Sequence, residues 1–210
     1  MSLLREYIRE LLTEAAMGPA DLPDGVFVTI EADDGYEVYF SDESGGRLRP
    51  SKGAEIYGYV GAEPLDPSRG FGDCLGAYVV IGSGATHGWG PMLYDVAMEV
   101  AGDAGMMADR QSLSKDAFNV WQVYMSRDDV QKKQLDDERN TLTPDEEDNC
   151  DMDTAIQRSG LTTADMFSSE WSDEDTADLL KDSPVMKVYT KGPTTIDTLK
   201  KMKPPRLIRK

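Results

Sequence analysis

The sequence predicts an α/β fold in which helices flank a mixed, mostly antiparallel sheet, with an amphipathic helix appended at the N-terminus. Three observations predict it. Short β-rich runs separated by turn residues fill the first part of the chain, a nearly continuous apolar run then leads through a glycine-rich loop into a helix, and helical and β-rich segments alternate after it. The 210 residues, with a hydrophobic content of 40%, suffice for one domain with appended segments.

The ends of the chain differ from its body in composition. A helical pattern over residues 3–12 gathers six apolar side chains on one face, and a small-residue linker up to residue 19 separates it from the rest. The body is expected over residues 20–192, with an acidic insertion around 136–178 that we interpret as a solvated loop region. Residues 193–210 are rich in Lys and Arg, and we expect them to form an extended, mobile basic tail.

Two β-rich runs, Val26–Ala32 and Tyr36–Ser41, are joined through Asp33-Asp34-Gly35, and an Asp-Gly turn is typical of a hairpin. With a third run, Ala54–Val60, they are predicted to form three antiparallel strands. The run Leu75–Ile81 is almost entirely apolar, which is typical of a central strand covered on both faces.

The following segments alternate between helix and strand. Pro91 suits the first turn of a helix that Gly102 ends, and Ser114 is the expected N-cap of a second helix. The remaining predicted elements are a short strand at Met106–Ala108, a short helix at Asp173–Leu180 and a final strand at Val185–Thr190.

The charge balance restricts the classes of partner. Lys and Arg number 22 against 39 Asp and Glu, a formal net charge of −17. Nucleic acid and anionic membranes are therefore not expected partners of the folded body. No apolar run approaches the roughly 20 residues that span a bilayer, and no signal-peptide core is present, so a cytoplasmic protein is the expectation.

The two cysteines give no sign of a metal site or a disulfide framework. Cys74 and Cys150 lie far apart in the sequence without CxxC spacing, so we expect reduced thiols and no bound metal.

The glycine-rich loop is the strongest candidate for a ligand site. Backbone N–H groups and the positive end of the helix dipole converge where a buried strand turns into a helix, which is a common way to hold a phosphate. Gly88 and Gly90 would let the backbone approach a ligand closely, with Trp89 between them. The alternative is a turn that only joins a strand to a helix.

The element order and this loop together resemble the GCN5-related N-acetyltransferase (GNAT) family. Its signature on a strand–loop–helix unit is Gln/Arg-x-x-Gly-x-Gly/Ala, and the counterpart here is Ala85-Thr-His-Gly88-Trp-Gly90, in which both glycines match and the first position does not. The resemblance implies acetyl-CoA, or another acyl-CoA, as the cofactor. The implied contacts are the backbone of Val79, Val80 and Ile81 for the pantetheine arm, and the loop of His87, Gly88, Trp89 and Gly90 for the pyrophosphate.

The same resemblance implies a V-shaped opening between the strands Leu75–Ile81 and Met106–Ala108, through which the pantetheine arm reaches unpaired backbone. The acidic body opposes binding of the polyanion CoA unless the basic tail or Arg110 compensates locally.

The family's second signature, Asn-x-x-Ala-x-x-x-Tyr, is altered here. Anchoring it on Ala117 puts Ser114 at the asparagine and Trp121 at the tyrosine. Tyr124, one turn further on, is the candidate acid that would protonate the thiolate leaving group, and a core tyrosine is the alternative. The general base stays open between the only histidine, His87, and a carboxylate.

The N-terminal segment carries a second resemblance. A short amphipathic helix that closes on Leu12-Thr13-Glu14 is similar to the capsid-targeting peptides of internal head proteins in T4-type tailed phages, which are cleaved after Leu/Ile-x-Glu. The resemblance implies a virion partner and a virion location for a phage-encoded chain. A helix that docks on its own domain or mediates a homo-oligomer through residues 1–14 is the alternative.

Two functions of different class follow. The first is an acyl-CoA-dependent N-acyltransferase, with acetyl as the expected group and a small-molecule or protein amine as acceptor. The alternative is a non-catalytic structural or internal head protein of a tailed phage that keeps the GNAT fold. The Gly-x-Gly loop favours the enzyme, and the altered second signature favours the scaffold.

Overall fold

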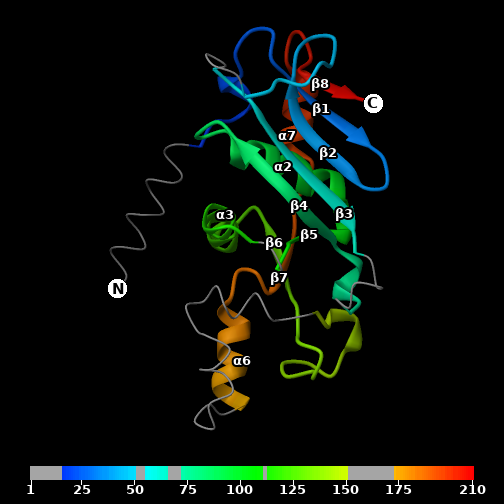
Figure 1. The fold of residues 1–210 in the computed structure, drawn as a ribbon, viewed down its shortest axis with the longest axis vertical. Coiled ribbons are helices and arrows are strands. Elements are labelled where there is room, and N and C mark those ends of the chain that lie inside the picture. Colours follow the sequence, from blue (N-terminus) through cyan, green and yellow to red (C-terminus); the bar gives the residue numbers. More distant parts are fainter. Residues whose placement is uncertain (1–15, 51–54, 66–71, 111–112, 151–172) are drawn as a thin grey trace, which may run out of the picture. The chain divides into compact units, whose positions relative to one another are not determined.

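The computed structural model describes residues 16–50, 55–65, 72–110, 113–150 and 173–210 (Figure 1). The fold is α/β with a mixed sheet, as predicted. The chain forms two compact units. Unit 1 comprises residues 1–63, 80–102 and 191–210, and unit 2 comprises residues 64–79 and 103–190. The predicted N-terminal helix and the segment that resembles a targeting peptide lie outside the described residues.

The first three strands of unit 1 confirm the predicted antiparallel arrangement. Strand β1 (Phe27–Ala32) pairs with β2 (Tyr36–Ser41), and β2 pairs with β3 (Gly58–Pro64), both antiparallel. In the β1–β2 turn the Asp33 N–H donates to the Gly35 carbonyl over 3.1 Å. Glycine is required at position 35, because a β-carbon there would lie 2.3 Å from the Ala62 carbonyl oxygen.

Strand β4 (Tyr78–Ala85) leads into helix α2 (Gly90–Ala101), as the apolar run and the loop after it predict. The strand begins three residues later than expected, because Cys74–Gly76 form a 3₁₀ turn, η3. The apolar face of α2 is fully buried at Leu93, Val96 and Ala97. The Tyr36 hydroxyl of β2 donates to the Ala97 carbonyl over 2.9 Å and fixes the helix on the sheet.

The C-terminal residues are folded, so the predicted extended tail is wrong. They form helix α7 (Thr194–Lys201) and strand β8 (Leu207–Arg209), and β8 pairs with β1 in parallel, Val28 opposite Leu207 (Figure 1). The strand order in unit 1 is β4-β3-β2-β1-β8. The basic composition predicted a tail, but the segment is an amphipathic helix. Its residues Thr195, Ile196 and Leu199 are buried at helical spacing among exposed lysines.

In unit 2 the strand order is β6-β7-β5, and β7 is antiparallel to both neighbours. The Ser114 hydroxyl caps helix α3 by accepting from the Ala117 N–H over 3.1 Å, as predicted. The sequence does not predict strand β6, because its residues are all polar and show no alternation of apolar and polar side chains. The elements are β5 (Met106–Ala108), α3 (Lys115–Ser126), β6 (Gln131–Gln134), α6 (Asp173–Asp182) and β7 (Lys187–Thr190).

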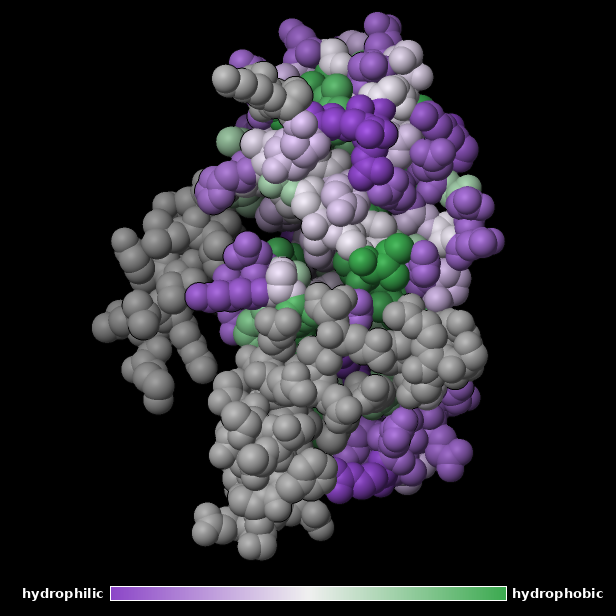
Figure 2. Space-filling model, viewed as in Figure 1, coloured by the Kyte–Doolittle hydropathy of each residue, from purple (hydrophilic) through white to green (hydrophobic). Residues whose placement is uncertain are grey.

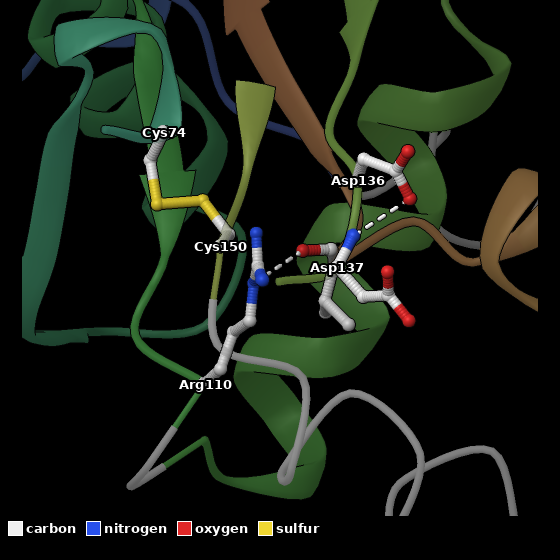
Figure 3. Close-up of a disulfide and its surroundings, with 6 residues drawn as sticks. Cys74, Arg110, Asp136, Asp137 and Cys150 are labelled. Carbon is white, nitrogen blue, oxygen red and sulfur yellow. Dashed lines mark hydrogen bonds between the residues drawn. A yellow bond between two sulfur atoms is a disulfide. The ribbon is translucent and has the colours of Figure 1, made fainter. Parts of the chain in front are cut away.

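A disulfide joins Cys74 to Cys150 in unit 2, so the expectation of reduced thiols is wrong (Figure 3). The two cysteines are 76 positions apart in sequence, and their Cα atoms lie 5.1 Å apart. Sequence spacing carries no information on such a pairing, because only the fold brings η3 beside residues 146–150.

The start of the acidic segment is an ordered loop and not the solvated region expected of it. Asp136 and Asp137 are buried in unit 2. The Asp136 carboxylate accepts the N–H group of Asp137 (Figure 3) and those of Leu142 and Thr143, each over 2.7 Å. These bonds offset the cost of burying the charge, which composition alone does not show. Residues 151–172 of the segment are outside the described ranges.

Hydrophilic residues cover most of the described surface on the face drawn in Figure 2. Among the described residues, no helix is long and apolar enough to cross a membrane.

Candidate functional site: the turn before helix α2

The predicted ligand loop is a tight turn within unit 1 that joins the end of β4 to the start of α2. The Trp89 N–H donates to the Thr86 carbonyl over 3.1 Å and closes the turn. Gly88 has a φ of +84°, a left-handed conformation that is strained for any residue with a β-carbon. The backbone of the turn itself therefore favours glycine at position 88, and the close approach of a ligand predicted for this residue stays a prediction.

Thr86 fixes the turn to the start of β3. Its N–H donates to the Tyr57 carbonyl and its hydroxyl accepts from the Tyr57 N–H, each over 2.9 Å. On the other side the Met17 N–H donates to the Gly88 carbonyl over 2.8 Å. Neither contact can be predicted from the sequence, because each joins segments that lie far apart in the chain. Together they hold the turn in one conformation before any ligand arrives.

Trp89 anchors the turn to the core of unit 1. Its side chain is only 7% exposed and meets the Phe40 ring edge-to-face, with centroids 5.5 Å apart. The buried indole therefore fixes the turn against the core of unit 1. His87 is exposed, so its imidazole is the side chain of the predicted loop that faces solvent.

The N-terminus of α2 follows directly, and its first amides have no carbonyl within the helix. The N-cap Trp89 donates its N–H within the turn, and Pro91 has none, which leaves the Gly90 and Met92 amides as the first-turn donors. A β-carbon at Gly90 would meet only the Ala85 Cβ, at 4.0 Å. Internal packing therefore does not require glycine at position 90, whereas a ligand that approaches the backbone would.

Side-chain burial varies along β4. Val79 and Val80 are buried, whereas Ile81 is 46% exposed. Gly82 and Gly84 lie under the Tyr59 ring, and β-carbons at these positions would come within 3.6 and 3.4 Å of it. These are ordinary van der Waals distances, so packing does not require glycine at either position. The residues predicted to contact pantetheine fall in both units, Val79 in unit 2 and the other two in unit 1.

In unit 2 the Tyr78 N–H donates to the Gly105 carbonyl over 3.0 Å, which joins the start of β4 to the residue before β5. Strands β4 and β5 are hydrogen-bonded neighbours in the sheet, so the predicted opening is not present where β4 begins, and an opening further along the two strands stays a prediction.

Tyr124, the candidate acid, belongs to unit 2. It is 1% exposed and packs against Trp121 and Tyr189, with ring centroids 6.3 and 6.5 Å away. The Arg127 guanidinium lies 4.9 Å from its ring centroid. These contacts favour the core role that the sequence left as the alternative.

Arg110, considered as a compensating cation for CoA, is also buried in unit 2. Its Nε donates to the Val185 carbonyl over 3.1 Å (Figure 3). The lysines and arginines of residues 194–210 are placed by α7 and β8. Unit 1 therefore presents helix amides at the turn, and neither Arg110 nor a mobile basic tail.

Two hydroxyl groups, from Ser83 of β4 and Tyr94 of α2, lie on the elements that the turn joins. The Tyr94 hydroxyl donates to the Ser83 hydroxyl over 2.9 Å, and burial raises the pKa of Tyr94, so this phenol stays neutral at physiological pH. Within the described ranges, no group of three or more His, Cys, Asp or Glu side chains is arranged to hold a metal ion.

Comparisons of the chain with models of protein families, with curated proteins and with solved structures found no match. Inferences about function therefore rest on the residues themselves.

Proposed function

We propose that the protein binds acyl-CoA at the turn before α2 and transfers the acyl group, with acetyl as the expected group, to an amine. The proposal rests on a difference between the two glycines of the loop in the reason for having glycine at each position. Gly88 is required by its left-handed backbone, whereas the packing of the protein gives no reason for glycine at Gly90. A phosphate that contacts the Gly90 backbone would supply that reason.

The turn has the properties that an anion site needs. It is fixed on both sides by main-chain hydrogen bonds, so little conformational entropy is lost on binding. The Gly90 and Met92 amides lie at the positive end of the α2 dipole. These groups are the local counterpart to the anionic pyrophosphate in a chain whose formal charge is −17.

The chemistry requires few side chains. The amine nitrogen attacks the thioester carbonyl, the C–N bond forms, the C–S bond breaks, and the proton lost by the amine ends on the thiolate. Positioning and a donor for the developing oxyanion supply most of the acceleration in such a reaction. The acidic surface would attract a cationic amine, which must lose a proton before it attacks.

Calorimetric titration of the full chain with acetyl-CoA tests the proposal. Gly88→Ala should weaken binding by at least tenfold, because a β-carbon forces the turn out of its left-handed conformation. Gly25→Ala is the matched control. Gly25 has a φ of +79°, close to that of Gly88, in the turn before β1 of the same unit, with no atom within 4 Å of an added β-carbon.

Both variants should lose similar stability, about 1 kcal/mol, and only Gly88→Ala should lose affinity. Absence of acetyl-CoA binding by the wild-type chain would contradict the proposal. Equal affinity of the two variants would contradict the placement of the site.

A further inference from the structure

The turn before β4 has an unusual backbone. Three consecutive residues, Cys74, Leu75 and Gly76, have positive φ values of 44°, 58° and 67°. Two of them carry a β-carbon, which crowds the carbonyl oxygen in this left-handed region. Such a conformation persists only where surrounding structure imposes it.

The disulfide and a set of main-chain hydrogen bonds impose it in unit 2. The Cys74 N–H donates to the Asn149 carbonyl, and the Cys150 N–H donates to the Asp136 carbonyl, each over 2.9 Å. The Asp136 N–H donates to the Asp148 carbonyl over 2.8 Å. The disulfide is the one covalent link between the turn and residues 136–150, and it closes a loop of 76 positions.

The turn at residues 74–76 leads directly into the start of β4. The Ala77 N–H donates to the Cys74 carbonyl over 3.2 Å, and the next residue, Tyr78, is held by Gly105. A change in the backbone at Leu75 is therefore transmitted within a few residues to the start of the strand.

We propose that the Cys74–Cys150 disulfide is a redox-sensitive lock that holds the strained turn against residues 136–150. Two equivalents of a thiol reduce it: the S–S bond breaks, each cysteine gains a proton and an electron, and the reductant leaves as its own disulfide. Leu75 then relaxes to the right-handed or extended region, because main-chain hydrogen bonds alone oppose the strain.

The lock responds slowly to reductant. Both cysteines are fully buried, so a thiolate reaches the sulfurs only when the turn opens. The inference does not depend on acyl-CoA binding, because its parts lie within unit 2 and its readout is the backbone itself.

Hydrogen–deuterium exchange of the full chain, air-oxidised and after incubation with dithiothreitol, tests the lock. Reduction should raise exchange at least tenfold at Cys74, Gly76, Ala77 and Cys150. The amides of Val28 and Lys210, which join β1 to the C-terminal residues of unit 1, should stay unchanged. The double variant Cys74→Ala/Cys150→Ala should exchange like the reduced protein in both buffers.

Two variants of Leu75 separate strain from simple loss of the crosslink. Leu75→Gly should keep most of its protection after reduction, because glycine adopts the left-handed turn without strain. Leu75→Ala, which also lacks the leucine side chain but keeps a β-carbon, should lose protection like the wild type.

Equal exchange of the oxidised and reduced wild type at the turn would overturn the proposal. Loss of protection in Leu75→Gly equal to that in Leu75→Ala would overturn the role of strain. A mass for the air-oxidised chain that retains both thiol hydrogens would overturn the lock itself.

Discussion

Replacement of Glu99 by glutamine should be among the most damaging single substitutions in unit 1. The Glu99 side chain is completely buried and accepts the N–H groups of Thr195 and Ile196 over 2.8 and 2.7 Å. It thereby caps the N-terminus of α7. It also accepts from the Lys191 ammonium, which is 3% exposed and has Asp95 3.6 Å away.

The expected loss of stability follows from the smaller number of hydrogen bonds that the glutamine amide can accept. Glutamine keeps one acceptor oxygen and replaces the other with a donor, so one α7 amide or the Lys191 ammonium loses its partner. Removing one charge of a buried pair costs about 3–5 kcal/mol, and the Lys191 ammonium would then keep only the Asp95 carboxylate, 3.6 Å away, as a counter-charge. Lys191→Met should cost less, because the helix amides and dipole still stabilise the Glu99 carboxylate.

Urea unfolding followed by far-ultraviolet circular dichroism measures these losses by linear extrapolation. The double variant Glu99→Gln/Lys191→Met should lose less than the sum of the single variants, by about 1–3 kcal/mol, because the two side chains interact directly. A loss below about 1 kcal/mol for Glu99→Gln, or strict additivity, would refute the reasoning.

Two further predictions concern buried charges elsewhere. Burial raises the pKa of the Asp148 carboxyl, and the nearby Asp136 and Asp145 carboxylates raise it further, although the Thr143 hydroxyl opposes the shift. The folded state therefore binds this proton more tightly than the unfolded state, and wild-type stability falls as pH rises from the unfolded pKa through the raised folded pKa. Asp148→Asn should gain stability relative to the wild type across this interval of a urea-midpoint series, and a difference independent of pH would contradict the assignment. Arg206→Met should cost about 1–3 kcal/mol in the same assay, because the buried guanidinium donates to two main-chain carbonyls. Exposed Arg209→Met should cost under about 0.5 kcal/mol, and equal losses would contradict the buried role.

The elements with local signals could be predicted from sequence. The β1–β2 hairpin follows from its Asp-Gly turn, and α3 follows from the Ser114 cap. Helix α2 follows from Pro91 and from apolar residues at helical spacing. In each case a few neighbouring residues determine the backbone, so no knowledge of distant contacts is needed.

The elements that depend on distant contacts could not be predicted. Strand β8 has three residues and exists because β1 offers it a parallel partner. The Cys74–Cys150 disulfide and the buried Asp136 depend on the same long-range arrangement in unit 2. The charged residues were misleading in both places. Lys side chains at the C-terminus surround buried apolar residues, and buried Asp side chains accept hydrogen bonds from backbone amides.

The candidate site shows the same division. The sequence pointed to Gly88 through its glycine-rich pattern, and the left-handed backbone supplies the physical reason. It did not point to Thr86, whose hydrogen bonds reach Tyr57, 29 positions earlier in the chain. It proposed Tyr124 as an acid, whereas the packing with Trp121 and Tyr189 that favours a core role is visible only in three dimensions.

Binding of acyl-CoA at the turn is the central claim, and the amide resonances of the turn report on it most directly. In a titration of the isotope-labelled full chain with acetyl-CoA, we expect the largest chemical-shift changes at the amides of Gly88, Gly90 and Met92. Smaller changes are expected along Val80 and Ile81, where the pantetheine arm would lie. Unchanged resonances at Gly88, Gly90 and Met92 with saturating acetyl-CoA would contradict the claim.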